Sequence, residues 1–249
     1  QIQGMLEEVN AQPPARTSVT GKSERAKDLA GLLSGPRKGA VLFLESEEIL
    51  SELRGISALV LVINEAPLLE QDIAILRSAD RMGIPTVVTL VGLSERVRRD
   101  EIPYVLATDT VMVDAVSEAI LPVVERISYQ MKGEAYRVAR ALPHFREPVS
   151  KVLIRYYSKL NGLVGAAALV PGADLSVMTV NQLRMVARLA GAHDIDLDAT
   201  RLVELAAVVG ASLGLRGFAR AALTLIPGPV RLIKGGVAFG GTTAVGEAA

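Results

Sequence analysis

The sequence contains no cysteine and no tryptophan, and aromatic residues make up only 4% of its 249 residues. The absence of cysteine excludes disulfides, thiolate zinc sites and a cysteine nucleophile, and it fits a reducing, cytoplasmic compartment. Half of the residues are nevertheless hydrophobic. The core must therefore be built from alanine, valine, leucine and isoleucine, whose small average size lets helices approach closely.

Long apolar runs and metal-ligand spacings are also missing. The longest run without a charged residue, Leu160–Ala173, has 14 residues, which is short of the roughly 20 that a membrane-spanning helix needs. Interfacial helices and half-inserted hairpins stay open. His144 and His193 are the only histidines, and neither has another ligand type at metal-site spacing, so no metal site is predicted.

The net charge is zero, but the charges are unevenly distributed. Residues 1–132 carry 14 basic and 19 acidic side chains, and residues 133–249 carry 13 basic and 8 acidic ones. The second part therefore suits an anionic counterpart, such as a lipid surface or an acidic partner, unless the difference reflects domain composition alone. No basic stripe is interleaved with aromatic residues, so nucleic acid is not an expected partner.

The first half of the chain alternates short apolar runs with amphipathic stretches. The expected strands are Ala40–Leu44, Ile56–Ile63, Pro85–Val91 and Tyr104–Ala107, and helices are expected over Ser23–Leu33, Leu68–Met82 and Val111–Tyr129. Strands that alternate with helices at this spacing predict βαβ units and a parallel sheet.

The second half shows helical patterns only, interrupted by glycine and proline. The expected helices are Tyr136–Leu142, Val149–Leu169, Leu175–Ala190, Ala199–Leu213, Phe218–Leu225 and Val230–Gly246. The predicted organisation is a flexible arm (1–20), an α/β domain (21–132), a linker (133–150) that includes His144, and a domain of helical hairpins (151–249).

One motif suggests phosphate chemistry. Gly21, Lys22 and Ser23 stand before a predicted helix, as in the G-x-x-x-x-G-K-[ST] loop that cradles nucleotide phosphates. Arg16 occupies the position of the first glycine, and residues 8–16 offer no strand to lead into such a loop. The competing interpretation is that Ser23 simply caps the helix.

The stretch from Ile56 to Ile127 resembles the second half of an Era-like small GTPase domain. It has an apolar strand ending in Ile63-Asn64-Glu65 and a Gly83-Ile84-Pro85 turn before the next strand. The resemblance implies a P-loop GTPase-like parallel sheet with helices.

The GTPase motifs that this resemblance implies are degenerate. Val91-Gly92-Leu93-Ser94 stands where the family has its guanine-reading Asn-Lys-x-Asp motif, and Glu45-Ser46-Glu47-Glu48 replaces the Asp-x-x-Gly motif that meets magnesium and the γ-phosphate. The base-contacting loop corresponds at best to Ala107-Thr108. A pseudo-GTPase, with at most weak GTP and magnesium binding at Gly21, Lys22 and Ser23, is therefore expected.

The C-terminal stretch from Leu160 to Ala249 resembles the YcjF-like domain of unknown function, which accompanies Era-like GTPase domains in bacteria. The motifs that carry this resemblance are Ala166–Pro171 leading to Asp174, Asn181–Val186, Leu225–Gly228 and Gly241–Ala248. The resemblance implies membrane association coupled to a GTPase-like domain, and it supplies no catalytic residues.

These patterns predict a regulatory or scaffold protein without catalytic residues or a required cofactor. Its counterparts would be a protein partner, a second copy or an anionic membrane at the inner face of the plasma membrane. The expected contact residues are Arg216, Arg220, Arg231 and Lys234, which bracket the apolar segment Ala221–Val230. The alternatives are a divergent GTPase or ATPase that uses Lys22 and Ser23, and a lipid-embedded assembly of the glycine-rich C-terminal helices.

Overall fold

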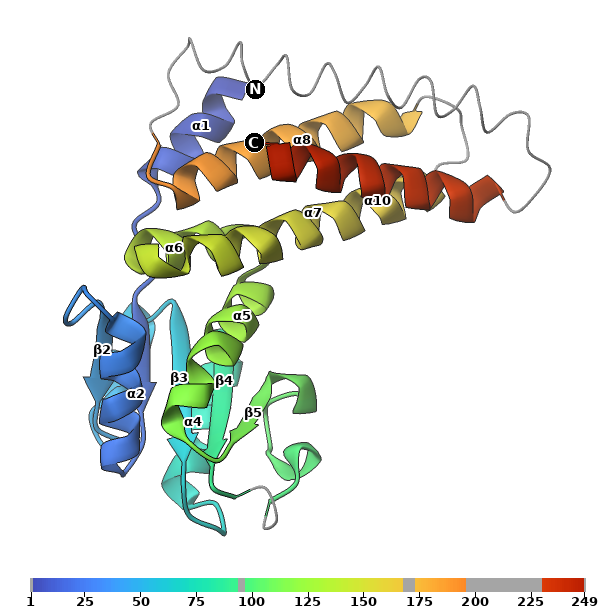
Figure 1. Cartoon of the computed structure of the whole chain (residues 1–249). Coiled ribbons are helices and arrows are strands. Elements are labelled where there is room, and N and C mark those ends of the chain that lie inside the picture. Colours follow the sequence, from blue (N-terminus) through green and yellow to red (C-terminus); the bar gives the residue numbers. More distant parts are fainter. Residues whose placement is uncertain (1, 94–96, 168–172, 196–229, 249) are drawn as a thin grey trace. The chain divides into compact units, whose positions relative to one another are not determined.

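The computed structural model describes residues 2–93, 97–167, 173–195 and 230–248, and the chain folds as two compact units (Figure 1). The sheet unit comprises Pro14–Met131 and Arg137–Val149. The helical unit comprises residues 1–13, Lys132–Tyr136 and the residues from Ser150 onward.

A five-stranded, all-parallel sheet forms the centre of the sheet unit, as the sequence predicts. Its strands are β1 Thr17–Thr20, β2 Val41–Leu44, β3 Ala58–Ile63, β4 Thr86–Val91 and β5 Thr110–Val113, in the order β2-β1-β3-β4-β5. Val60 of β3 pairs with Val19 and Val87 on its two neighbours, and all three side chains are fully buried. Continuous burial explains why β3 is apolar at every position and β4 at four of its six positions.

Helices and short 3-10 turns connect these strands or follow the last of them. The helices are α2 Glu24–Ser34, α3 Ile49–Glu52, α4 Glu70–Arg81, α5 Ile120–Met131 and α6 Tyr136–Ala141, and the turns are η1 Leu53–Gly55, η2 Arg99–Glu101, η3 Ala107–Asp109, η4 Val116–Ala119 and η6 Pro143–Phe145. The buried face of α2 consists of Ala26, Leu29, Ala30, Leu33 and Ser34, which is the face that the helical spacing predicts.

Residues 1–20 differ from the predicted arm, because they contain a helix and the strand that lies between β2 and β3. Helix α1 spans Ile2–Ala11 and buries Leu6 and Val9, and β1 is completely buried. Three of the four residues of β1 carry hydroxyl groups. Such a short, polar strand leaves no apolar pattern for sequence analysis to detect.

The fifth strand also lies outside its predicted position. Tyr104 has a φ of 64°, Ala107–Asp109 form a 3-10 turn, and Leu106 is 70% exposed. The strand begins at Thr110 instead, and the helix expected from Val111 begins only at Ile120. An apolar run in a connecting loop was mistaken for a strand.

The region predicted as a linker belongs largely to the sheet unit. Ala15 donates its backbone N–H to the carbonyl of Arg137 (2.9 Å), and Arg37 Nη1 donates to the carbonyl of Arg140 (3.3 Å). His144 Nε2 lies 3.0 Å from the carbonyl of Leu33, near the end of α2. A Cβ at Gly35 would lie 2.9 Å from this ring, so glycine is needed where α2 ends.

The helical unit contains α1, the turn η5 Lys132–Ala135, most of α7 Arg146–Ala167, α8 Ala173–Ala192 and α10 Val230–Ala248. The helices expected over Ala199–Leu213 and Phe218–Leu225 lie outside the described residues. Ser150 contacts His193, and Asn161 contacts Met178. The residue nearer the C-terminus of α7 therefore contacts the residue nearer the N-terminus of α8, so the two helices are antiparallel. Within the described ranges, no helix is both long and apolar enough to cross a membrane.

Candidate functional site at the carboxyl edge of the sheet

The strand order creates a topological switch point between β1 and β3. After β1 the chain passes to β2 on one side, and it then returns to β3 on the other side of β1. Open α/β sheets bind ligands outside the carboxyl ends of the strands that flank such a point. Residues Gly21–Ser23 follow β1 directly, and residues 64–69 follow β3. The sequence-predicted phosphate residues therefore lie at the edge of the sheet where a ligand site would form.

The backbone around this motif is unlike a phosphate loop. In the G-x-x-x-x-G-K-[ST] pattern, four residues between the glycines wrap around phosphate. The corresponding residues here, Thr17–Thr20, form strand β1 and pair with both neighbouring strands. Only Gly21–Ser23 separate β1 from α2. The loop is too short to enclose a phosphate chain in the usual way.

Gly21 has a packing role that explains its identity. Its φ is +155°, and a Cβ at this position would lie 2.6 Å from the carbonyl oxygen of Val62 and 3.1 Å from Cβ of Ala26. Val62 belongs to β3, which is held by β1 and β4. Glycine therefore lets the chain turn from β1 into α2 close against the end of β3.

Lys22 and Ser23 lie at the start of α2. The Lys22 side chain is exposed, and Ser23 occupies the N-cap position in an extended conformation. Ser23 Oγ is buried but makes no capping hydrogen bond. Thr20 Oγ1, at the end of β1, and Ser46 Oγ, two residues after β2, also lack a hydrogen-bond partner within the part of the chain that the structure describes. The alternative role of Ser23 as an N-cap agrees with its position but not with its hydroxyl contacts.

A carboxylate on α4 is electrostatically linked to Lys22. Asp72 is only 6% exposed, and its carboxylate accepts a hydrogen bond from the backbone N–H of Leu69 (3.2 Å). Burial raises the pKa of Asp72, while the Leu69 hydrogen bond and the charge of Lys22 act in the opposite direction. Desolvation is the largest effect. Lys22 thus has an acidic counterpart from the chain itself.

Arg25 is a residue of this edge that sequence analysis missed. Its Nη1 donates to the carbonyl of Val91 at 3.1 Å, which ties the first turn of α2 to the end of β4. Gly92 lies beside the same guanidinium. The signal in the sequence was weak, because an arginine in the first turn of a helix is ordinarily a solvated side chain.

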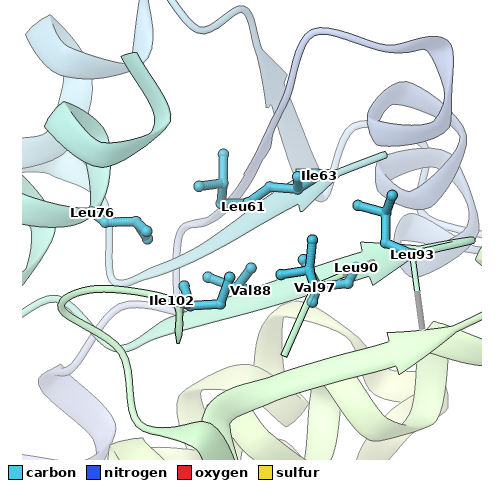
Figure 2. Close-up of a cluster of buried hydrophobic side chains, with 8 residues drawn as sticks. All are labelled: Leu61, Ile63, Leu76, Val88, Leu90, Leu93, Val97 and Ile102. Atoms are coloured by element: carbon cyan, nitrogen blue, oxygen red, sulfur yellow. The ribbon is translucent and has the colours of Figure 1, made fainter. Parts of the chain in front are cut away.

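Apolar side chains gather around the end of β4, where the GTPase resemblance predicts a guanine-reading motif. Leu93 is 2% exposed and packs in a buried cluster that covers the carboxyl ends of β3 and β4. Figure 2 shows its members: Leu61, Ile63, Leu76, Val88, Leu90, Leu93, Val97 and Ile102. The connection from β4 to β5 supplies Leu93, Val97 and Ile102. An apolar side chain therefore occupies the place of the polar base-reading contact that the GTPase resemblance implies.

The other two motif positions are also occupied by structural contacts. The backbone N–H of Glu45 donates to Glu48 Oε2 (3.4 Å), and the N–H of Ile49 donates to the carbonyl of Glu45 (3.0 Å), so this segment starts α3. Ala107-Thr108 precedes β5 rather than following it. The base-contacting loop predicted there is wrong, because these residues lie at the amino edge of the sheet, opposite Gly21.

The helical unit contains a second charged cluster, which was not predicted. Arg188 of α8 makes an ion pair with Glu134 at 2.7 Å, lies 3.8 Å from Glu8 of α1, and donates a short hydrogen bond to Tyr157 of α7. Burial raises the pKa of Tyr157, and the nearby arginine partly offsets this effect. A Cβ on Gly133 would overlap Arg188. The cluster joins three helices and a turn, which is a structural role.

The four predicted membrane contacts are described only in part. Arg231 and Lys234 belong to α10, whereas Arg216 and Arg220 lie outside the described residues. Among the residues that the structure does describe, no group of three or more histidine, aspartate or glutamate side chains is placed to hold a metal ion.

No protein-family model, no curated protein and no solved structure matches this chain.

Proposed function

We propose that this protein is a non-catalytic regulator or scaffold. In this proposal, a pseudo-GTPase α/β region is coupled to a YcjF-like helical region that binds an anionic membrane or another protein at the cytoplasmic face of the membrane. The main support for a protein that does not hydrolyse nucleotides is the burial of Leu93 among Ile63, Leu90 and Val97. A polar nucleotide base would have to displace this apolar cluster, and displacement would expose several fully buried side chains.

The backbone at Gly21 gives independent support. Because Thr17–Thr20 are committed to strand pairing, the backbone N–H groups that a phosphate loop directs at its ligand are used in the sheet. Catalysis of phosphoryl transfer depends on positioning and charge stabilisation by such groups and by magnesium. The proposal therefore assigns the edge of the sheet to protein recognition.

A divergent nucleotide-binding protein is the second candidate. It is favoured by the buried hydroxyl of Ser23, which has no hydrogen-bond partner among the described residues and lies beside the exposed Lys22 at the start of an 11-residue helix. Such a site could contact one phosphate group, with the helix dipole as support. Strand β1 opposes this function, because its residues pair with both neighbouring strands where a phosphate loop would wrap its ligand.

Ligand-dependent stability separates the two candidates. A nucleotide that binds with a Kd about 1,000-fold below its concentration would stabilise the folded chain by about 4 kcal/mol. The non-catalytic proposal predicts the same urea midpoint with and without millimolar GTP or ATP and magnesium. An upward shift that disappears in Lys22→Gln would establish the second candidate. Lys38→Gln, another exposed lysine of the same unit, is the matched control.

A further inference from the structure

The three long helices of the helical unit enclose polar side chains. Asn161 of α7 donates to the carbonyl of Met178 in α8 (3.2 Å) and to Thr242 Oγ1 in α10 (2.9 Å), and Asn181 donates to Asn161 Oδ1 (2.8 Å). Gln182 Nε2 lies 3.5 Å from Thr242 Oγ1. The buried members of this polar seam are Asn161, Asn181, Gln182 and Thr242. Its polar groups bond to one another where a water-soluble bundle would normally pack apolar side chains.

Large apolar side chains are exposed on the same three helices. Leu163 is 70% exposed, Val177 is 49% exposed and Phe239 is 40% exposed. Each lies within one helical turn of a residue that joins the helices, since Asn161 contacts both Met178 and Thr242. Figure 1 shows α7, α8 and α10 side by side. Buried polar side chains and exposed apolar side chains therefore occur at neighbouring positions of these helices.

The exposed stripe of α7 changes from basic to apolar toward the C-terminal end of the helix. Lys151, Arg155, Lys159 and Leu163 follow one another at four-residue spacing, and all four are exposed. Residues four apart lie on one face of a helix. On α8, the exposed Arg184 lies three residues beyond Asn181. Exposed cations therefore stand on the same helices as two members of the apolar end, which is defined as Leu163, Val177 and Phe239.

From this arrangement we infer that the apolar end enters the headgroup region of an anionic lipid bilayer, with Arg155, Lys159 and Arg184 contacting the lipid phosphates. The inference rests on the proposed function in that it identifies the lipid-binding surface of the helical region. Apolar side chains gain free energy at the acyl boundary, and each nearby cation adds attraction to anionic lipid. An anionic bilayer therefore offers an acyl boundary to the apolar side chains and lipid phosphates to the cations.

A second copy of the chain fits this surface less well. In a two-fold symmetric dimer, the same patch meets itself, so Arg155, Lys159 and Arg184 of the two copies would come close together. Like charges that face each other across an interface disfavour association. An anionic surface, in contrast, complements all three charges.

Sedimentation with vesicles tests the inference on the full chain. The vesicles contain phosphatidylcholine with or without phosphatidylserine, at low and high salt. We expect Leu163→Gln/Phe239→Gln to weaken partitioning at least about tenfold at both salt concentrations, because apolar burial does not depend on ionic strength. Arg155→Gln/Lys159→Gln should lose about 30-fold at low salt only, which corresponds to about 1 kcal/mol per cation.

The matched controls come from the sheet unit. Leu32→Gln/Leu50→Gln changes two side chains that are each 43% exposed, and Lys27→Gln/Lys38→Gln changes two exposed lysines. Both controls should bind vesicles like the parent, and unchanged urea midpoints establish that all variants are folded. Light scattering of each variant reports the oligomeric state.

Three results would overturn the inference. If the parent binds anionic vesicles and the Leu163/Phe239 double variant binds equally well, another surface carries the proposed membrane role. If the parent binds no vesicles, the membrane branch of the proposed function fails as well. If the parent is a dimer that the same double variant dissociates, and vesicles are not bound, the apolar end faces a second copy.

Discussion

Replacing Gly21 with alanine separates a packing role from a ligand-binding role at the candidate site. The added Cβ would lie 2.6 Å from the carbonyl oxygen of Val62, which belongs to a buried strand paired on both sides. The loop must therefore shift, or φ must leave +155°. Backbone strain of this kind costs on the order of 1–3 kcal/mol, and overpacking costs a similar amount. We expect Gly21→Ala to lower the free energy of unfolding by about 3 kcal/mol.

Gly31→Ala is an internal control, because we expect it to raise the free energy of unfolding. Gly31 lies in α2, and a Cβ there would meet nothing within 4 Å. Alanine in an exposed helix interior is more favourable than glycine by about 0.5–1 kcal/mol. Both variants can be compared by urea unfolding, followed by circular dichroism because the chain lacks tryptophan. With an m value of about 2 kcal/mol per molar urea, the Gly21 substitution should lower the midpoint by about 1.5 M.

Hydrogen exchange measured on peptides localises this effect. Amides of β3 and the first turn of α2 should lose protection in Gly21→Ala and keep it in Gly31→Ala. The reasoning is refuted if Gly21→Ala retains the parent midpoint and protection. A variant of normal stability with altered GTP affinity would show that this glycine serves a ligand.

Three further predictions test other parts of the structure. Leu93→Ala should cost about 2–5 kcal/mol in urea unfolding because it leaves a cavity among buried side chains, whereas Leu106→Ala, at a 70% exposed position, should be nearly neutral; equal effects would contradict the buried cluster. Asn161→Ala should cost about 3 kcal/mol, because the amide of Asn181 and the hydroxyl of Thr242 lose a buried partner, and unchanged stability would argue against the polar seam. Burial raises the folded-state pKa of Asp72 above its unfolded value, so the folded state holds this proton more tightly. The stability of the parent relative to Asp72→Asn should therefore rise as the pH falls through that pKa, and a fall over the same range would contradict the assignment.

The strongly apolar strands could be predicted from the sequence because both of their faces are buried. The prediction of Ile56–Ile63 and Pro85–Val91 agrees with β3 and β4 within two residues at each end. The hydroxyl-rich β1 could not be recognised, since its burial comes from the neighbours with which it pairs rather than from its own composition. The position of β5 was missed because Tyr104–Ala107 is as apolar as a strand, and the left-handed backbone of Tyr104 has no signature in the sequence.

The helix that follows Gly21, Lys22 and Ser23 could be predicted, but the strand before them and the contacts of the candidate site could not. Gly21, Lys22 and Ser23 do stand between a parallel strand and a helix. The close approach of Gly21 to Val62 and the hydrogen bond from Arg25 to Val91 join segments that are far apart in the chain. Such contacts depend on strand order, which local patterns do not determine. The same reason applies to the polar seam, whose asparagine, glutamine and threonine residues would ordinarily be assigned to solvent.

Calorimetric titration of the full chain with GTP in the presence of magnesium tests the central claim most directly. The account predicts no binding heat beyond dilution, because β1 occupies the positions of the phosphate loop and Leu93 fills the position of the base-reading contact. Saturable, magnesium-dependent binding with a Kd of about 1 μM, equivalent to about −8 kcal/mol, would contradict this account and favour the nucleotide-binding candidate if Lys22→Ala abolished it.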